Sequence, residues 1–331
     1  QIQNPRNSKV LKVYSEAVRE LYEIVKDEDL SAFTKYFKDG SKYFGDFSKQ
    51  AFQETDGIIN RMVEAVAPEI PQKIPKNGIA SLGPDFTYSS IATRKWRGKR
   101  QNPIVFFNKI AEAVKAVAKG QVTEGVICVE NRIQGTVREA IDALFKENVH
   151  IIGELKISIH HCIATQKGSK LSDIRAVMSH PQALNQSSDY LRRKLPNVKW
   201  ITANSTAAAF EHVHKNRDNS IAAIGPEPAA KHYELKILDK QIENDKSNET
   251  RFVIITKNAP KKVPTKNAKT SIIFYFSKDK AGSLFSVFKI FNDLGLNLAH
   301  IESRPAPRKL GEYLFYLDFE GSRAAKKGAE A

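Results

Sequence analysis

The residues best suited to chemistry lie in five short polar clusters, each of which follows an apolar, strand-like run and precedes a helical pattern. The clusters are SLGPDFTYSS (81–90), VENRIQGT (129–136), VMSHPQALNQ (177–186), TANSTAAA (202–209) and AIGPEPAA (223–230). In open α/β sheets, ligands bind beyond the carboxyl ends of the strands, where free backbone N–H groups and helix dipoles favour anions. Five such corners predict a small polyanionic ligand held between two lobes.

Several other chemistries are excluded by motifs that the sequence lacks. It contains no GxxxxGK[ST] or GxGxxG phosphate-binding loop and no G-x-S-x-G nucleophile elbow. His160 and His161 are adjacent in a strand pattern and should point to opposite faces, so we expect core or surface histidines and no metal site. Cys128 and Cys162 lie in apolar runs and are expected to be small buried side chains rather than reactive thiols. We therefore predict no metal, no cofactor and a reducing, cytoplasmic location.

Strands and helices that alternate along the chain must position these clusters. From residue 79 onward, amphipathic helical patterns separate strand-like runs at 104–107, 125–129, 157–164, 175–179, 198–202, 220–224 and 250–256. Asn108 is predicted to cap the helix after the first of these runs, and Thr136 with Glu139 is predicted to form a capping box. Such alternation predicts α/β layers around a largely parallel sheet.

Both ends of the chain depart from this pattern. Residues 1–67 have apolar side chains at helical spacing, which predicts an all-helical segment. Residues 257–269 contain lysines and two prolines without a periodic apolar pattern, which is typical of a semi-extended linker. A strand, a helix and two more strands are predicted to follow. A complete ferredoxin-like unit needs a further helix and strand, which we expect to be absent.

Composition limits the classes of partner. The chain has 331 residues with 52 basic and 37 acidic side chains, hence a net charge of +15, and its mean hydropathy is −0.42. No apolar run approaches the roughly 18–20 residues that span a bilayer. Ten basic residues lie in two acid-free stretches, 93–100 and 256–269. Because no aromatic platform or zinc finger accompanies them, we predict neither a nucleic-acid nor a membrane partner.

Taken in order, five motifs resemble the prephenate dehydratase family: GPDFTYS, VENRIQGT, SHPQALNQ, NSTAAA and NETRF, over about residues 79–256. The resemblance implies a two-lobed, periplasmic-binding-protein-like domain that converts prephenate to phenylpyruvate, water and carbon dioxide. In this family the threonine of the TRF motif is regarded as the proton donor to the leaving hydroxyl, which implies Thr250 here. By position, the substrate-binding residues would be Thr87, Ser89, Glu130, Asn131, Ser179, Gln186, Ser205, Thr206 and Arg251.

Some of these residues also have purely structural interpretations. Ser179 with Gln182 fits a capping box, and Ser205 fits an ordinary N-cap. Arg251 is expected either to hold a substrate carboxylate or to pair with an internal acid. Family members usually have glycine where Phe86 stands, so a bulky side chain there could crowd the site.

The C-terminal part resembles the ACT regulatory domain that follows the catalytic domain in this family, through SLF after Gly282 and ESRP at 302–305. The resemblance implies inhibition by phenylalanine, bound at ACT-domain interfaces of a homodimer or homotetramer. The implied effector-binding residues are Gly282, Ser283, Leu284 and Asn297, with Glu302, Ser303, Arg304 and Pro305 opposite.

We therefore expect a helical segment at 1–70, a catalytic domain at 78–256, a linker at 257–269 and an incomplete ferredoxin-like ACT domain at 270–331. The first segment resembles the C-terminal helical part of prephenate dehydrogenases, which some organisms fuse to the dehydratase. Since a nucleotide-binding half would lie upstream, we do not expect this chain to be a competent dehydrogenase. Two alternatives remain: an arogenate dehydratase, which performs the same elimination on the aminated side chain, and a non-catalytic sensor that closes on an amino acid or dicarboxylate.

Overall fold

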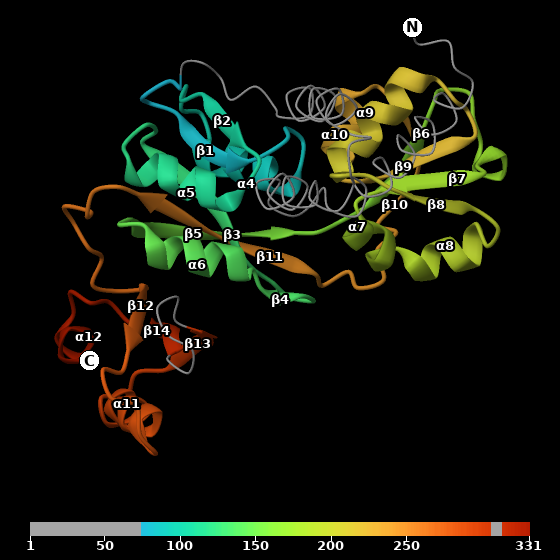
Figure 1. The fold of residues 1–331 in the computed structure, drawn as a ribbon. Coiled ribbons are helices and arrows are strands. Elements are labelled where there is room, and N and C mark those ends of the chain that lie inside the picture. Colours follow the sequence, from blue (N-terminus) through green and yellow to red (C-terminus); the bar gives the residue numbers. More distant parts are fainter. Residues whose placement is uncertain (1–73, 306–312) are drawn as a thin grey trace, which may run out of the picture. The chain divides into compact units, whose positions relative to one another are not determined.

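A computed structural model describes residues 74–305 and 313–331 of the chain. The described residues form three β-sheets, each with helices packed against it (Figure 1). The helical segment expected at 1–70 lies outside the described residues.

The first sheet is mixed rather than largely parallel. Its strands are β1 (Ile79–Leu82), β2 (Ile104–Phe107), β3 (Glu124–Asn131), β4 (Gly135–Thr136), β5 (His150–Ser158) and β11 (Glu249–Thr256). The order is β2-β1-β3-β11-β5, with β4 paired to β3. Strand β1 is parallel to β2 and β3, whereas β11 is antiparallel to both β3 and β5. The sheet is mixed, and not largely parallel as predicted, because β11 returns from the second sheet and runs opposite to β3 and β5.

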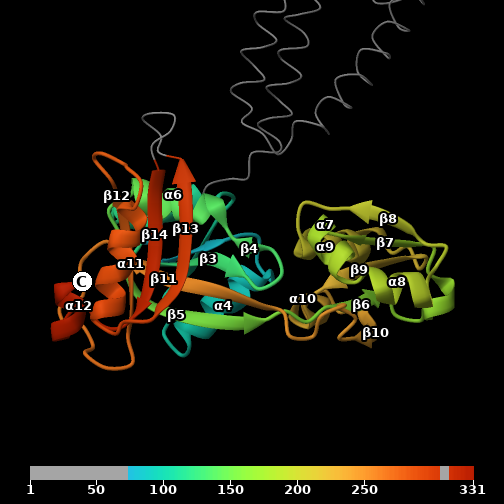
Figure 2. The same ribbon diagram turned by 90° about the horizontal axis from the view of Figure 1, so that it is seen from below.

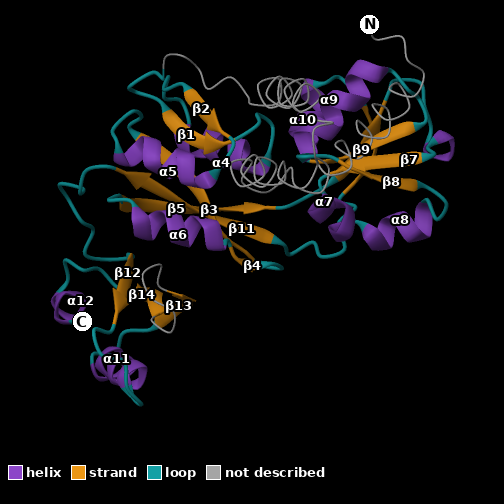
Figure 3. Cartoon of the chain, viewed as in Figure 1, coloured by secondary structure: helices purple, strands orange, loops and turns teal. Residues whose placement is uncertain are grey.

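Helices pack on both faces of this sheet (Figure 3). They are α4 (Tyr88–Arg97), α5 (Ile110–Ala118) and α6 (Arg138–Lys146). Along β11, Phe252 and Ile254 belong to the apolar cluster with α4, while Val253 and Ile255 belong to the cluster with α5 and α6. Alternate side chains of one strand thus serve opposite faces, as the two-residue period of a strand requires.

The second sheet has the strand order β10-β6-β9-β7-β8. Its strands are β6 (Cys162–Thr165), β7 (Ala176–Ser179), β8 (Lys199–Thr202), β9 (Ile221–Gly225) and β10 (Lys236–Lys240). The helices here are α7 (Pro181–Gln186), α8 (Ser188–Lys194), α9 (Thr206–Asn216) and α10 (Glu227–His232), and a 3₁₀ turn spans Leu171–Asp173. A Cβ added at Gly225 would lie 2.7 Å from the Phe210 ring, so only glycine allows α9 to pack this closely on β9.

Two chain segments, residues 159–161 and 241–248, connect the first two sheets, and we call them the hinge segments (Figure 2). The strand predicted at 157–164 is interrupted by the first of them, so it corresponds to the end of β5 and the first three residues of β6. The two segments are hydrogen-bonded to each other: Ile159 N donates to Asn248 O at 2.9 Å, and Ile242 N donates to His161 O at 3.1 Å.

The predicted helix caps fail at two positions. Helix α5 begins after Lys109 rather than Asn108, and no side chain caps it. Helix α6 begins after Val137, so Thr136 and Glu139 form no capping box. The Thr136 hydroxyl donates instead to Glu302 Oε2 at 3.1 Å, a partner distant in sequence that a local rule does not detect.

The C-terminal domain, residues 269–331, contains the third sheet. Its elements are β12 (Lys269–Tyr275), α11 (Ser283–Asp293), β13 (Leu298–Pro305), β14 (Tyr313–Glu320) and α12 (Lys326–Glu330). The antiparallel order β12-β14-β13 is that of a ferredoxin-like unit, and the predicted β-α-β-β order is confirmed. The helix expected to be absent is present as the short α12. Residues 257–268 contain no helix or strand.

Candidate active site

Thr250, near the start of β11, is buried, with 7% of its surface exposed. It pairs across the strands with Asn131 at the end of β3. Asn131 Nδ2 donates to Thr250 Oγ1 at 2.9 Å, and Asn131 Oδ1 accepts the backbone N–H groups of Ile133 and Gln134, both at 3.1 Å. These two backbone bonds orient the amide so that its NH₂ group faces Thr250. The threonine therefore accepts from Asn131 and keeps its own proton for another acceptor.

Asn248 completes this group, although sequence reasoning assigned it no role. Its Oδ1 accepts a hydrogen bond from Asn131 Nδ2 at 3.0 Å. Its Nδ2 is buried and has no hydrogen-bond partner among the described residues. A buried amide donor normally has a partner, so this nitrogen is a candidate for contact with a bound ligand. The signal available in the sequence was its place in NETRF, two residues before Thr250.

Glu130 and Arg251 face away from Thr250. Each is the next residue along its strand from one member of the Asn131–Thr250 pair, so its side chain points to the opposite face of the sheet. Arg251 is 8% exposed and pairs with Glu154 at 2.7 Å, with Asp318 at 2.6 Å and with Glu130 at 3.6 Å. Of the two interpretations of Arg251, the structure shows the pairing with internal acids. Glu130 and Arg251 therefore lie on the face of the sheet opposite Thr250, and we do not propose them as substrate ligands.

Gln186, at the end of α7, is linked to the hinge through His161. Gln186 Oε1 lies 3.0 Å from His161 Nε2, and the other ring nitrogen, Nδ1, lies 3.1 Å from the Tyr88 hydroxyl. The imidazole thus joins α7, beside the second sheet, to α4, beside the first. Burial lowers the pKa of His161, which favours the neutral ring despite the opposing effects of Gln186 and Glu243. Gln186 Nε2 is buried without a hydrogen-bond partner among the described residues.

His160 and His161 are held separately by one acid. Glu243, in the second hinge segment, contacts His160 Nδ1 at 2.7 Å and accepts the His161 backbone N–H at 2.8 Å. His161 is buried, whereas 44% of the His160 side chain is exposed. Residues 74–305 and 313–331 contain no group of three or more His, Cys, Asp or Glu that could hold a metal ion.

The first motif lies at the start of α4. Thr87 caps this helix: its Oγ1 accepts from Ser90 N at 3.3 Å and donates to Pro84 O at 3.0 Å. Ser89 lies in the first turn and is half-buried. Phe86 has a φ of +63°, in the left-handed region that favours glycine. Its ring, expected to crowd the site, stacks on His232 of α10 with centroids 3.9 Å apart.

The serines of the second sheet differ in their local roles. Ser179 is fully buried and donates to Ile224 O at 2.5 Å, and the cap of α7 is His180, so the capping-box interpretation of Ser179 is wrong. Ser205 does cap α9 by accepting from Ala208 N at 3.0 Å, and the half-buried Thr206 is the first residue of that helix. No hydrogen bond within the described part of the chain joins these side chains to Thr250.

The predicted effector residues lie at two places in the C-terminal domain. Gly282 precedes α11 with a φ of +87°, a conformation that L side chains rarely adopt. Ser283 Oγ accepts from Lys280 N at 3.1 Å, Leu284 is half-buried and Asn297 is exposed. On β13 the ESRP residues alternate: Ser303 and Pro305 are exposed, while Glu302 and Arg304 are half-buried and contact β4 and α6 of the preceding domain. Glu302 accepts from Thr136, and Arg304 binds Asp142 of α6 at 2.8 and 3.0 Å.

These features define a class of protein: a two-lobed α/β domain with buried amides and a hydroxyl beside its hinge, followed by a ferredoxin-like domain. In the described part of the chain, no helix has the length and apolar character needed to cross a membrane.

Comparison with known proteins gives the family. Residues 79–260 match the family model described as prephenate dehydratase, and residues 270–331 match that of the ACT domain. The chain is 39% identical over 243 residues to a prephenate dehydratase of Methanocaldococcus jannaschii, an alignment that covers 72% of this chain and 87% of the relative. It is 30% identical over 255 residues to a bifunctional chorismate mutase/prephenate dehydratase of Enterobacter agglomerans, covering 76% of this chain and 65% of the relative.

A solved structure agrees with these matches. The prephenate dehydratase of Arthrobacter aurescens in complex with L-Phe is 27% identical, with a TM-score of 0.71, and the match covers 76% of this chain and 83% of that one. The chain belongs to the prephenate dehydratase family and carries a C-terminal ACT domain. The two-lobed fold and the family predicted from the sequence motifs are confirmed.

Proposed function

We propose that the chain converts prephenate to phenylpyruvate, water and carbon dioxide, with Thr250 as the hydrogen-bond donor to the leaving hydroxyl. The observation that carries this role is the hydrogen bond from Asn131 Nδ2 to Thr250 Oγ1 at 2.9 Å. Because Thr250 accepts this bond, its proton is free to be shared with a substrate oxygen. The burial of both residues limits competition from water.

The elimination needs little beyond binding and one proton. The bond from the ring to its carboxylate breaks and carbon dioxide leaves. The electron pair completes the aromatic ring, and the carbon–oxygen bond to the hydroxyl breaks as that oxygen takes up a proton to leave as water. An alcohol is a weak acid at neutral pH, so we assign Thr250 a hydrogen bond that shares its proton with the departing oxygen, rather than full release. The one proton that the reaction consumes comes from solution, and Thr250 keeps its hydroxyl proton at the end of the turnover. The site must also orient two carboxylates.

We assign the remaining residues to substrate binding. Asn248 Nδ2 and Gln186 Nε2 are buried donors without partners among the described residues, and we propose that each binds a substrate oxygen. Asn131 holds Thr250 in place. The hydroxyls proposed to line the site lie at or near helix starts, where backbone N–H groups favour carboxylates. They belong to Thr87, Ser89, Ser179, Ser205 and Thr206.

The direct test is to incubate the full chain with prephenate and follow phenylpyruvate by its absorbance in alkali, beside a Thr250→Ala control. Product that disappears in the control supports both the reaction and the role of Thr250. Product from arogenate but not from prephenate would instead favour the arogenate dehydratase alternative. Binding of either compound by calorimetry without any product would favour the non-catalytic sensor.

We propose that phenylalanine inhibits this activity through the ACT domain. The assignment uses Gly282, Ser283, Leu284 and Asn297 together with the ESRP residues 302–305, and it is supported by the ACT match and by the L-Phe complex of the Arthrobacter aurescens protein. Phenylalanine should reduce the turnover of the wild-type chain. Leu284→Asp should weaken this inhibition at least tenfold while the uninhibited rate stays within twofold. Equal inhibition of both proteins would reject this effector site.

The assembly we propose is a homodimer or homotetramer joined through the ACT domain. Several large apolar side chains are exposed there: Tyr275, Phe285, Ile290, Ile301 and Tyr313. Exposure of this many large apolar side chains on one small domain favours a protein-binding surface. Phe285, 70% exposed, is the most exposed of them. Phe285→Glu should lower the mass measured by light scattering to that of a monomer, and an unchanged mass would contradict the proposal.

The wider organisation of the chain is also a proposal. We retain the boundaries 1–70, 78–256, 257–269 and 270–331, supported by the lack of helix or strand at 257–268, and expect limited proteolysis to cut there first. For residues 1–70 we propose a common origin with the C-terminal helical part of prephenate dehydrogenases, on the helical spacing of their apolar residues alone. The two free cysteines support a reducing, cytoplasmic location.

A further inference from the structure

The strand pair that holds Thr250 has a second functional face. Thr250 pairs with Asn131, and the next pair along the same two strands is Arg251 with Glu130. The first pair forms the candidate active site, whereas the second points to the other side of the sheet and meets the ACT domain. Two adjacent residue pairs therefore connect the catalytic hydroxyl with the regulatory domain without any intervening element.

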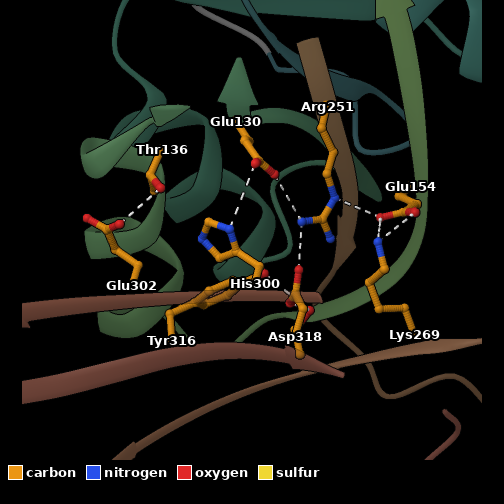
Figure 4. A network of polar contacts seen from close by, with 10 residues as sticks. Glu130, Thr136, Glu154, Arg251, Lys269, His300, Glu302, Tyr316 and Asp318 are labelled. Carbon is orange, nitrogen blue, oxygen red and sulfur yellow. Dashed lines mark hydrogen bonds and ion pairs between the residues drawn. The ribbon is translucent and has the colours of Figure 1, made fainter. Parts of the chain in front are cut away.

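Arg251 is the centre of the contacts on this second face (Figure 4). Its guanidinium pairs with Asp318 of β14 at 2.6 Å and with Glu154 of β5 at 2.7 Å. Asp318 is fully buried, and its Oδ1 accepts from Ser271 Oγ at 2.5 Å. The carboxylates thus approach one cation from both domains. Lys269, where β12 begins, also binds Glu154 at 3.2 Å.

Two further contacts join the ACT domain to the same part of the first sheet. His300 of β13 lies 3.8 Å from Glu130, and Glu302 accepts from the Thr136 hydroxyl of β4, which pairs with β3 (Figure 4). Both strands of the active-site pair are thereby attached to the ACT sheet. A buried charge with several fixed partners has little freedom to shift, since moving it leaves a partner unpaired.

We propose that Arg251 is a positioning residue: its ion pair with Asp318 of the ACT domain fixes the strand pair that sets the Thr250 hydroxyl against Asn131. Arg251 touches no substrate and acts through the backbone of its neighbour. The ACT domain is then part of the structure that prepares the active site, and a shift of this domain changes the position of Thr250. This inference rests on the dehydratase activity proposed above.

The test compares two carboxylates that cross the same interface. Asp318→Asn removes the charge of the ACT-domain partner of Arg251. Asp142→Asn removes the charge of the Arg304 partner; Asp142 lies on α6 and, within residues 74–305 and 313–331, forms no hydrogen bond or ion pair with β3 or β11. In the full chain, Asp318→Asn should lower kcat for prephenate at least tenfold with KM within twofold of wild type. Asp142→Asn should leave both constants within twofold, although it also removes an interdomain ion pair.

The outcomes separate this inference from the proposed function. A wild-type chain without turnover would reject the function itself. With an active wild type, equal kcat values for Asp318→Asn and wild type, or equal losses in both variants, would overturn the role of Arg251. Should Asp318→Asn unfold, as circular dichroism would show, Arg251→Lys replaces it as the test. Lysine keeps the charge but lacks the planar five-donor fork with which Arg251 contacts Asp318 and Glu154. A folded Arg251→Lys variant with lowered kcat supports the inference, and one with wild-type kcat overturns it.

Discussion

Replacing Thr250 by valine removes the hydroxyl while nearly preserving the shape of the side chain, so it isolates the proton-sharing role. Loss of a general acid–base contact lowers rates about 10²- to 10⁴-fold, equivalent to about 3–5 kcal/mol of transition-state stabilisation. The bond to the departing oxygen forms fully only in the transition state. The loss should therefore appear in kcat, with KM little changed.

The same change should also lower stability, by an amount that the structure limits. Without Thr250 Oγ1, one hydrogen of Asn131 Nδ2 loses its acceptor, and an unsatisfied buried donor costs about 1–3 kcal/mol. The Glu249 carbonyl oxygen lies 3.4 Å from the same nitrogen and can take over in part, so we expect the lower half of that range. Urea unfolding would measure this loss separately from turnover.

Thr250→Ser is the matched control, because it keeps the hydroxyl and loses one methyl group, worth about 0.8 kcal/mol when buried. Its kcat should stay within tenfold of wild type. A folded Thr250→Val variant with kcat within tenfold of wild type would refute the proton-sharing role. A serine variant as slow as the valine variant would show that the methyl packing, not the hydroxyl, determines the rate.

Three further predictions concern Tyr88 at the hinge, Glu154 at the interface with the ACT domain, and the two cysteines. Tyr88→Phe removes the hydroxyl that donates to the backbone oxygen of His160, in the first hinge segment, at 2.6 Å. We expect the free energy of unfolding in urea to fall by about 1 kcal/mol and kcat/KM to fall several-fold. Unchanged values of both would contradict a role for this hydrogen bond in holding the hinge. Burial raises the pKa of Glu154, but Arg251 and a lysine lower it below its usual value overall. The ionised carboxylate therefore stabilises the fold above its unfolded pKa of about 4.3, and this effect is lost as the pH falls through the lower folded pKa. Glu154→Gln should thus be less stable than wild type at pH 7, and the difference should shrink as the pH is lowered below about 4.3. Burial raises the pKa of Cys128 and Cys162 to about 12, so a thiol reagent at pH 8 should label both only after denaturation, and rapid labelling of the native protein would contradict this.

Much of the fold was accessible from the sequence because apolar periodicity is a local property. The strand predicted at 104–107 has those bounds in the structure, and the strand predicted at 175–179 covers Ala176–Ser179. The predictions that failed also used local rules, and contacts with residues distant in sequence overrode them. Thr136 and Glu139 had the spacing of a capping box, but the hydroxyl of Thr136 bonds Glu302, far along the chain.

The candidate site was less accessible, because its geometry depends on strand register. The resemblance of VEN and NETRF to the family motifs implied that Asn131 and Thr250 belong to one site, but no sequence pattern gives the antiparallel register that places Asn131 Nδ2 2.9 Å from Thr250 Oγ1. His161 was judged as part of a continuous strand. Its role in linking α4 to α7 arises only because the strand stops there and the chain crosses between the sheets.

The register between β3 and β11 also explains why neighbouring residues of one motif have different roles. A sequence motif marks a position along the chain, whereas a strand sends successive side chains to opposite faces. In TRF, Thr250 therefore faces the site and Arg251 the ACT domain, and in VEN the same division separates Asn131 from Glu130. A misplacement of about 1 Å at a catalytic group can cost about 10²-fold in rate. A movement of the ACT domain that displaces the Arg251–Asp318 ion pair, and with it β3 and β11, by about this distance is therefore sufficient to change the catalytic rate. The ACT domain need not contact the substrate to do so.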